Sequence, residues 1–491
     1  MITVLTQEMT NYLQAQEFQF NTLQFLICFA RRHRLTDRPA YEQWLDEFRE
    51  ANIRFSETKK TLNEIYPEGW VVPNRDEPET FADQLIRLFP NGSTDPMHIG
   101  GKHCKDVTLQ VTENCNMACT YCYQGHKTSH AMDFETAKKF VDWLLESKDP
   151  YINADDSDGV VIDFIGGEPF LEIGLIRKVA EYFVTRAFEL HHRFATRFMF
   201  SITSNGLLYF EPEVQEFFDE YQMHTSFSIT IDGNKQLHDT CRLDKGGSGT
   251  YDRAIAAVNH FVNVRHGYMG SKMTIAPANV GYVYEAAKNM IDYGYKHIFL
   301  NCVYEEGWTV DHARTLYKQL CQLADYLVTL ENRPTLSIFD KKCGHPLSEN
   351  ENQNWCGGNG LMLAVDYHGD LYPCLRYMPS SVGPDVEPFV IGDIEHGVCN
   401  KERIHCLSCV TRCSQSTDAC IHCPIASGCS WCTAYNYQIF GTPNKRATFI
   451  CPMHKARVLA NEYYWHLVGE EYSIEMPEQW RREIVDGRNQ F

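Results

Sequence analysis

The chain has 491 residues, so we expect it to divide into two to four domains rather than to bury a single core. Its hydrophobic content of 44% and charged content of 22% are typical of globular proteins, and its net charge of −19 argues against a nucleic-acid partner. No stretch has the roughly 18 apolar residues of a membrane span, and residues 1–14 lack the pattern of a secretory signal. We therefore expect a cytoplasmic protein with no membrane partner.

The twenty cysteines of this chain indicate metal sites, because cytoplasmic thiols are kept reduced and rarely form disulfides. Three lie together at Cys115, Cys119 and Cys122, and eleven more recur at patterned spacings from Cys343 to Cys451. The other six are scattered, and we expect them to be small core residues: Cys28, Cys104, Cys241, Cys302, Cys321 and Cys399.

Residues 1–100 are predicted to be helical, because Asn21–Arg32, Ala40–Ala51 and Thr80–Phe89 carry apolar residues at helical spacing. This region would either recognise a substrate or support the domain that follows.

Residues 101–310 alternate short apolar runs with helical segments. The predicted strands are Val107–Val111, Val160–Ile165, Phe198–Thr203, Ser226–Ile231, Met273–Ala276 and His297–Asn301. The predicted helices are Phe134–Ser147, Ile173–Glu189, Pro212–Tyr221, Tyr251–Val264 and Val283–Tyr293. This alternation predicts an α/β fold, a partial (β/α)6 barrel of the TIM type, with a doubly wound sheet as the alternative. Chemistry is expected at the carboxyl ends of the strands in either case.

The remaining sequence divides into three parts. A linker helix is expected within residues 311–342. Residues 343–457 are rich in Cys, Gly and Pro and hold too little apolar material for a conventional core, so we expect this domain to fold around metal. Residues 458–491 form the C-terminal tail, entered by a helix over His454–Trp465.

The first cysteine group has the spacing CxxxCxxC, Cys115-Asn-Met-Ala-Cys119-Thr-Tyr-Cys122, and directly follows the first predicted strand. Three thiolates from one loop can hold three irons of a [4Fe–4S] cluster and leave the fourth iron free for another ligand. Zinc is the alternative, although structural zinc sites usually have four ligands in paired CxxC spacing.

A second motif, Gly166-Gly167-Glu168-Pro169, follows the second strand. Alone it would be a turn, but together with CxxxCxxC it resembles the radical S-adenosylmethionine (SAM) superfamily over residues 104–303. The resemblance implies that SAM binds the open iron and is cleaved to a 5′-deoxyadenosyl radical in an oxygen-sensitive enzyme. It further implies cofactor contacts from residues at these motifs: Tyr121, Gly166, Gly167, Glu168, Pro169, Ser204, Asn205, Thr230, Asp232 and Arg242.

The C-terminal cysteines resemble the SPASM domain, which holds two auxiliary [4Fe–4S] clusters. The matching residues are Cys356, Cys374, Cys420, Cys423, Cys429, Cys432 and Cys451. The resemblance implies one cluster, distant from SAM, on Cys420, Cys423, Cys429 and Cys451, and a nearer one on Cys356, Cys374 and Cys432. Cys343 would complete the nearer cluster, or the position would stay open for a substrate thiolate.

An added group, Cys406-x2-Cys409-x3-Cys413, precedes these cysteines. With Cys420 and Cys423 it gives CxxC-x10-CxxC, so zinc within residues 406–423 is an alternative to the ligand sets above.

The C-terminal motifs resemble those of maturases that install thioether links in Cys-containing precursor peptides, with a flavodoxin or ferredoxin as the electron donor. Formylglycine-generating sulfatase maturases are the runner-up, but they have an Asp base where this chain has Leu375. Asp366 and Asp370 are the nearby carboxylates that we consider as catalytic candidates. Carbon–carbon crosslinking or epimerisation of a peptide is a further alternative, and a non-catalytic iron–sulfur or zinc scaffold is the remote one.

Overall fold

The computed structural model describes residues 105–485, except 148, 150, 152–158, 191, 193, 195–197, 266, 268, 270, 355 and 359–361. The helical region predicted for residues 1–100 lies outside the described residues, as do Cys28 and Cys104. None of the described helices is both long enough and apolar enough to cross a membrane.

Four parallel strands form the first half of the barrel: β1 (Lys105–Thr112), β2 (Val160–Gly166), β3 (Phe198–Ser204) and β4 (Thr225–Ile229). Their side chains alternate between two faces. On one face Leu109, Phe164 and Phe200 are fully buried. The other face carries polar residues, among them Thr108 and Asp163, which lie opposite each other in the register.

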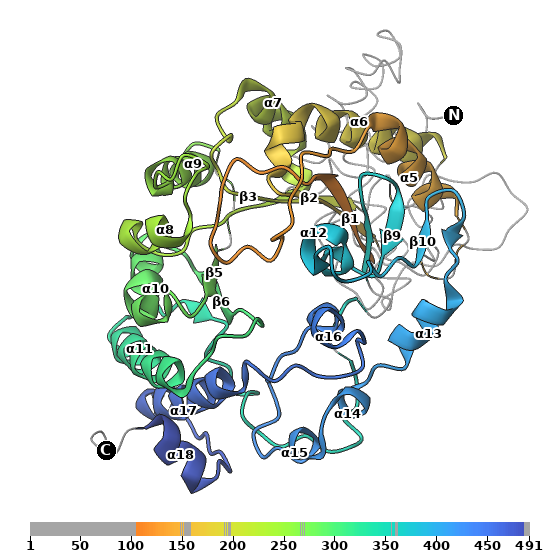
Figure 1. Cartoon of the computed structure of the whole chain (residues 1–491). Helices are drawn as coiled ribbons and strands as arrows, with labels where there is room; N and C mark the ends of the chain where they lie inside the picture. The colour runs from red at the N-terminus through yellow and green to blue at the C-terminus, as the bar shows by residue number, and fades with distance from the viewer. Residues whose placement is uncertain are drawn as a thin grey trace, which may run out of the picture.

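The parallel arrangement continues in β5 (Ser271–Ile275), β6 (His297–Cys302) and β7 (Thr335–Leu336), although no backbone hydrogen bonds join β4 to β5. Helices surround the strands in an outer arc (Figure 1). They are α5 (Phe134–Glu146), α6 (Ile173–Glu189), α7 (Pro212–Tyr221), α8 (Lys235–Cys241), α9 (Tyr251–Asn263), α10 (Val283–Asp292) and α11 (Val310–Val328). All six predicted strands and all five predicted helices of this region are present, which confirms the α/β barrel; α8 was not predicted.

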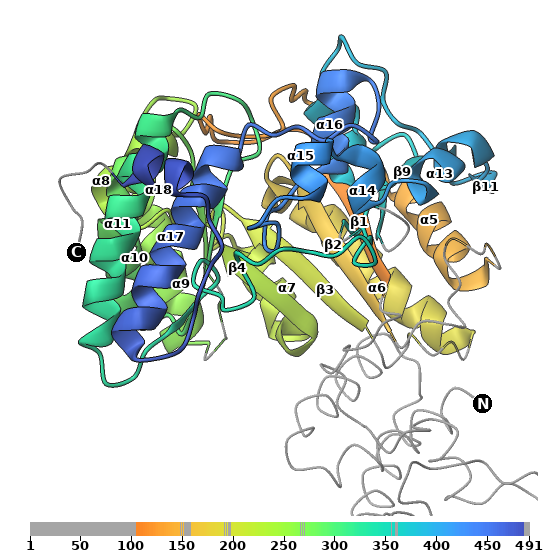
Figure 2. The same cartoon turned by 90° about the horizontal axis from the view of Figure 1, so that it is seen from below.

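The C-terminal region adds short elements to the open side of the barrel (Figure 1). Its strands are β8 (Met362–Val365), β9 (Asp370–Tyr372), β10 (Gly392–Asp393) and β11 (Gly397–Val398). Its helices are α12 (Pro379–Val382), α13 (Lys401–Ser408), α14 (Arg412–Gln415), α15 (Asp418–Ile421), α16 (Thr433–Phe440), α17 (Cys451–Val468) and α18 (Glu478–Ile484). Figure 2 shows α17 packed along α11.

The junction between the two regions is a shared sheet. Strand β8 pairs in parallel with β1, so that the sheet of the barrel continues into the β8–β9 hairpin. The Gln110 side chain on β1 also donates to the Ser380 hydroxyl of α12 at 2.9 Å. The cysteine-rich region, expected as a separate domain over 343–457, is therefore joined to the barrel by backbone pairing.

Candidate active site and its cysteine groups

The loop that carries the first three cysteines is held by the segment after α8. The amide of Ala118 donates to the carbonyl of Leu243 at 2.9 Å, and the amide of Thr120 donates to the carbonyl of Cys241 at 3.0 Å. The loop is thus fixed by backbone hydrogen bonds to a second loop at the same end of the barrel.

The Gly-Gly-Glu-Pro turn needs its glycines because backbone lies against it. A Cβ on Gly167 would fall 2.2 Å from the carbonyl oxygen of Asn114, and one on Gly166 would fall 2.4 Å from that of Thr112. The two residues therefore allow the turn to pass directly beneath the cysteine loop.

Glu168 joins this turn to the end of β3. Its carboxylate accepts from the Ser204 hydroxyl and from the Asn205 amide, both at 2.8 Å. The Asn205 side chain donates to Asn116 on the cysteine loop at 2.6 Å. The structure thus brings together three of the predicted motifs: the cysteine loop, the glycine turn and the end of β3. The buried Glu168 carboxylate is used in these contacts.

Asp232 and Arg242 form a buried pair beside the same loop. Arg242 Nε donates to Asp232 Oδ2 at 2.9 Å, and the Tyr121 hydroxyl donates to the same oxygen. The other oxygen, Asp232 Oδ1, is buried and accepts no hydrogen bond from the described residues. Thr230, by contrast, is placed by its backbone amide, which donates to the Ser204 carbonyl at 3.1 Å.

The three thiols of the loop share a cationic environment. Arg242 Nη1 lies 3.9 Å from Cys119 Sγ, and its guanidinium lies 5.6 Å from the centre of the Tyr121 ring. Burial alone would lower the pKa of Lys127, but the Cys122 and Cys115 thiols raise it.

These residues fit a [4Fe–4S] cluster with SAM. Thiolates are the ligands that such a cluster takes, and two cations oppose the negative charge that three thiolates bring together. The unsatisfied Asp232 Oδ1 offers a buried acceptor for a hydroxyl of a bound molecule.

A second group consists of Cys356, Cys374 and Cys432. A Cβ on Gly358 would lie 3.6 Å from the sulfurs of both Cys356 and Cys374. Burial raises the pKa of Cys374, and the Cys432 and Cys356 thiols raise it further. We call these three residues the near group.

A third group consists of Cys420, Cys423, Cys429 and Cys451, which we call the distal group. Burial raises the pKa of Cys429 to about 12; Arg446 opposes this rise, and the other three thiols add to it. Arg446 Nη2 donates to Cys429 Sγ at 2.8 Å and stacks on Trp431 with the guanidinium 4.8 Å from the ring centre.

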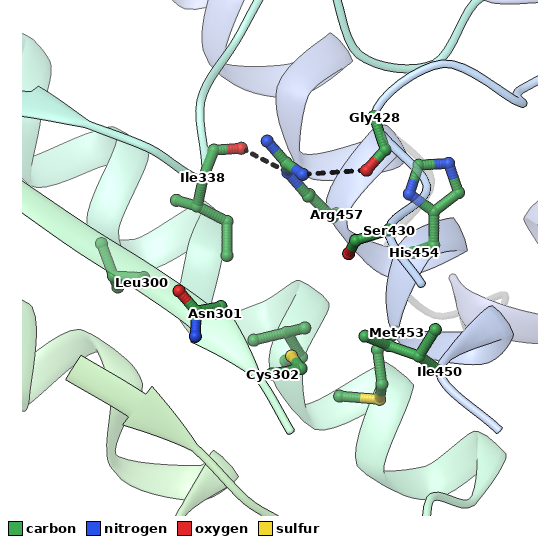
Figure 3. A pocket seen from close by; sticks show the side chains of 11 residues that line it. Leu300, Asn301, Cys302, Ile338, Gly428, Ser430, Ile450, Met453, His454 and Arg457 are labelled. Atoms are coloured by element: carbon green, nitrogen blue, oxygen red, sulfur yellow. Dashed lines mark hydrogen bonds between the residues drawn. The ribbon is translucent and has the colours of Figure 1, made fainter. Parts of the chain in front are cut away.

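A pocket between β6 and α17 is lined in part by Gly428 and Ser430, the two neighbours of Cys429 in the chain (Figure 3). Cys302 lies on its β6 side, and burial raises the pKa of this thiol to about 12. Arg457 closes one end by donating to the carbonyls of Ile338 at 3.0 Å and Gly428 at 3.3 Å.

Cys343 is fully buried next to Gly428, on whose Cα an added Cβ would fall 2.8 Å from the sulfur. Its carbonyl accepts from the Tyr472 hydroxyl at 2.5 Å. Cys343 therefore packs against the segment that leads into the distal group, whereas Cys374 lies at the end of the β8–β9 hairpin.

The added cysteines lie apart on α13 and α14. Cys409 Sγ is 3.7 Å from His405 Nε2, and the amide of Cys413 donates to Asn352 Oδ1 at 2.7 Å. Burial raises the pKa of Cys406, with a further rise from Cys409. No set of three or more His, Cys, Asp or Glu side chains in the described part of the chain is arranged to hold a single metal ion, so zinc at residues 406–423 stays a prediction.

The two carboxylates considered as catalytic candidates lie in the β8–β9 hairpin. Asp366 Oδ1 accepts from the amides of His368, Gly369 and Asp370 at 2.9–3.1 Å, and Oδ2 accepts from the Tyr372 hydroxyl at 3.0 Å. These bonds make Asp366 the residue that shapes the turn. Asp370 starts β9 and lies beside a surface groove.

The residues that join the first loop to the near group were not predicted from the sequence. Tyr123 directly follows Cys122, and the guanidinium of Arg376 lies 5.2 Å from its ring centre. On its other side Arg376 faces the ring of Tyr435 at 5.9 Å, and it forms an ion pair with Glu305 at 2.5 Å. The available signal was that Tyr123 directly follows Cys122 and that Arg376 lies two residues after Cys374.

Comparisons with known proteins agree with this geometry. Residues 109–320 match the radical SAM superfamily. An uncharacterized protein of Methanocaldococcus jannaschii is 26% identical over 277 residues, which cover 55% of this chain and 84% of that protein. A serine-type anaerobic sulfatase-maturating enzyme of Bacteroides thetaiotaomicron is 29% identical over 170 residues, only 33% of this chain and 36% of that enzyme.

Among solved structures, native anSMEcpe with bound AdoMet and the Kp18Cys peptide shares the fold with a TM-score of 0.53 at 18% identity. The superposition covers 74% of this chain and 98% of that structure. The region matched to the radical SAM superfamily contains the cysteine loop, the glycine turn and the Asp232–Arg242 pair, so the match covers the part of the chain that forms the candidate site.

Proposed function

We propose that this enzyme modifies a Cys-containing peptide and installs thioether links between cysteine sulfur and carbon. Two comparisons support a peptide or protein substrate: one relative is named as a sulfatase-maturating enzyme, and one solved structure of similar fold holds a peptide. The low-potential electron donor and the cytoplasmic location predicted from the sequence belong to the same proposal.

The observation that carries the proposal is that the near group has three thiols and faces the first cysteine loop across Arg376. The fourth thiol considered for it, Cys343, instead packs beside Gly428. A three-thiol group leaves one iron position open, and a thiolate is a suitable ligand for that position. This arrangement favours a substrate cysteine as the fourth ligand.

The residues of this chain then have distinct roles. Cys115, Cys119 and Cys122 would hold the cluster, which when bound would supply the electron for cleavage of SAM and hence the hydrogen-abstracting radical. Arg242 and Lys127 balance the charge of the loop, and Asp232 Oδ1 accepts a hydrogen bond from the bound cofactor. Arg376 holds the near group at a fixed position relative to the loop through Tyr123, Tyr435 and Glu305.

The experiment is anaerobic incubation of the reconstituted enzyme with SAM, a reductant and short Cys-containing peptides encoded near its gene. Loss of two hydrogens per event together with loss of an alkylatable thiol supports the thioether. Loss of two hydrogens with the thiols intact indicates carbon–carbon bonding instead. Unchanged mass with deuterium uptake indicates epimerisation, and absence of 5′-deoxyadenosine from the reduced protein supports a non-catalytic scaffold.

A further inference from the structure

The inner face of the barrel carries one layer of polar side chains across four strands. The register places Thr108, Asp163, Ser201 and Ser226 opposite one another on β1, β2, β3 and β4, and we call this set the inner layer. The neighbouring positions on each strand point to the helices and, except for Thr225 on β4, are apolar, so the inner layer faces the middle of the barrel.

Solvent reaches this face. Ser226 is exposed, as are Thr203 on β3 and Lys272 on β5, although all three lie within strands of the barrel. Thr203 Oγ1 is 3.1 Å from Ser228 Oγ, which forms a second pair of hydroxyls nearer to the carboxyl ends of the strands. A wall of hydroxyls beneath the cysteine loop is suited to bind a polar chain such as an extended peptide.

Asp163 is the carboxylate of the inner layer. Its partners are the hydroxyls of Ser201 and Thr108, while Asp106 on the same face of β1 adds a like charge. Burial is the main cause that raises the pKa of Asp163 to about 6. Tyr123 is a further titratable group whose charge would interact with that of Asp163.

Tyr123 joins the first cysteine loop to Arg376 beside the near group. It follows Cys122 in the chain, and the guanidinium of Arg376, two residues after Cys374, lies 5.2 Å from its ring centre. Asp163 lies on the barrel wall three residues before Gly166, and the Gly166–Gly167 turn packs against the start of the cysteine loop, so Asp163 lies close to the end of the barrel that carries this loop.

Three other carboxylates near the site, Glu168, Glu305 and Asp366, are already engaged. Glu168 accepts hydrogen bonds from Ser204 and Asn205, and Glu305 is paired with Arg376. Asp366 shapes the β8–β9 turn. Asp163 has only hydroxyl partners, which can turn toward another acceptor when a proton arrives.

We propose that Asp163 is the catalytic residue that accepts the thiol proton of the substrate cysteine, an assignment that rests on the proposed thioether chemistry. In the overall reaction one S–H and one C–H bond break and one C–S bond forms. SAM, after reduction by one electron, takes the hydrogen atom from carbon and leaves as methionine and 5′-deoxyadenosine. The second electron passes to an iron–sulfur acceptor, and the thiol proton passes to the Asp163 carboxylate.

The test compares the unsubstituted enzyme with Asp163→Asn, using a Cys-containing peptide that the unsubstituted enzyme converts. Asparagine keeps the hydroxyl contacts and removes a buried charge, so the fold should be retained. We expect product formation to fall at least about 100-fold, the usual effect of losing a general base, while hydrogen abstraction, read as deuterium transfer into 5′-deoxyadenosine, stays within about threefold.

The pH profile gives a second readout. Product formation by the unsubstituted enzyme should decline below about pH 6, because the carboxylate is then protonated. Asp106→Asn removes the like charge and should move this decline to lower pH, whereas a merely structural Asp163 would leave it in place.

Equal product formation by Asp163→Asn, or a decline that Asp106→Asn does not move, would overturn the assignment and leave the thioether proposal standing. If the unsubstituted enzyme removes no thiol from any such peptide while still forming 5′-deoxyadenosine, the thioether proposal fails and this assignment fails with it.

Discussion

The barrel and the cysteine-rich region are stabilised in different ways. In the barrel, aromatic side chains such as Phe164, Phe200 and Phe227 are buried in one layer between sheet and helices. In residues 343–451, buried polar side chains bind backbone carbonyls: Arg412 donates to the carbonyls of Ser348 at 2.8 Å and Glu351 at 3.0 Å. The barrel is therefore stabilised by apolar burial. The cysteine-rich region is stabilised by hydrogen bonds between residues distant in the sequence and by the clusters that its thiols are proposed to bind.

The largest expected effect is a loss of SAM cleavage without a loss of thermal stability. Cys119→Ala should abolish SAM cleavage because one of three thiolate ligands is lost, while the barrel keeps its thermal stability because Cys119 lies in a loop outside the apolar layer. The measurements are 5′-deoxyadenosine formation and thermal unfolding. Cys321→Ala on α11 is the control and should retain cleavage; an active Cys119→Ala enzyme would remove the proposed cluster site.

The next prediction concerns the apolar layer. Phe164→Ala should lower the free energy of unfolding by about 3–5 kcal/mol, because a fully buried ring in contact with Phe200 is removed. The loss, measured by denaturant unfolding, should be equal in iron-loaded and iron-free protein. A loss confined to iron-loaded protein would show that the stability of the barrel depends on the metal and not on apolar burial alone.

For the cysteine-rich region the corresponding change is Arg412→Ala. Arg412 is 2% exposed, and its removal leaves buried carbonyls without a donor, so we expect a loss of about 2–4 kcal/mol. Limited proteolysis should then cut within residues 343–451 before it cuts the barrel. Arg412→Lys keeps the positive charge but lacks the several N–H donors of the guanidinium group. Its free energy of unfolding should therefore lie between those of the unsubstituted protein and Arg412→Ala. Uniform cleavage of both regions would show that they unfold together.

The smallest effect is at a helix end of the barrel. Asp133 caps α5 by accepting from the Thr136 amide at 2.7 Å, and Asp133→Ala should cost about 1 kcal/mol. The hydrogen bond to Thr136 lowers the pKa of Asp133, so its contribution is present above about pH 4 and is lost as pH falls further. Asp133→Asn should keep the cap and lose this pH dependence; an unchanged acid transition would contradict it.

The two regions also differ in how well the sequence predicts them. Strand and helix periods in the barrel come from local apolar patterns, so α6 and α7 begin and end at the predicted residues. The short helices α13 to α15 were not predicted, because they bury few apolar residues and depend on caps such as Thr411. Local sequence could not reveal the pairing of β8 with β1, which is a long-range contact.

The candidate site follows the same division. Spacing within one loop predicted that Cys115, Cys119 and Cys122 share an environment, whereas the near and distal groups came from the resemblance to the SPASM domain. Neither predicted the Tyr123–Arg376–Tyr435 contact, which joins three separate segments. Asp163 was not predicted, although the sequence carries a signal for it: it is the only charged residue in the apolar run Val160–Ile165.

The pairing of β8 with β1 has a consequence for synthesis on the ribosome. One edge of β1 has no partner until Val365 has left the exit tunnel, long after β2 to β4 have been made. An uncovered edge of a parallel sheet is a template for pairing with other chains. Truncations that end before β8 are therefore expected to aggregate during expression.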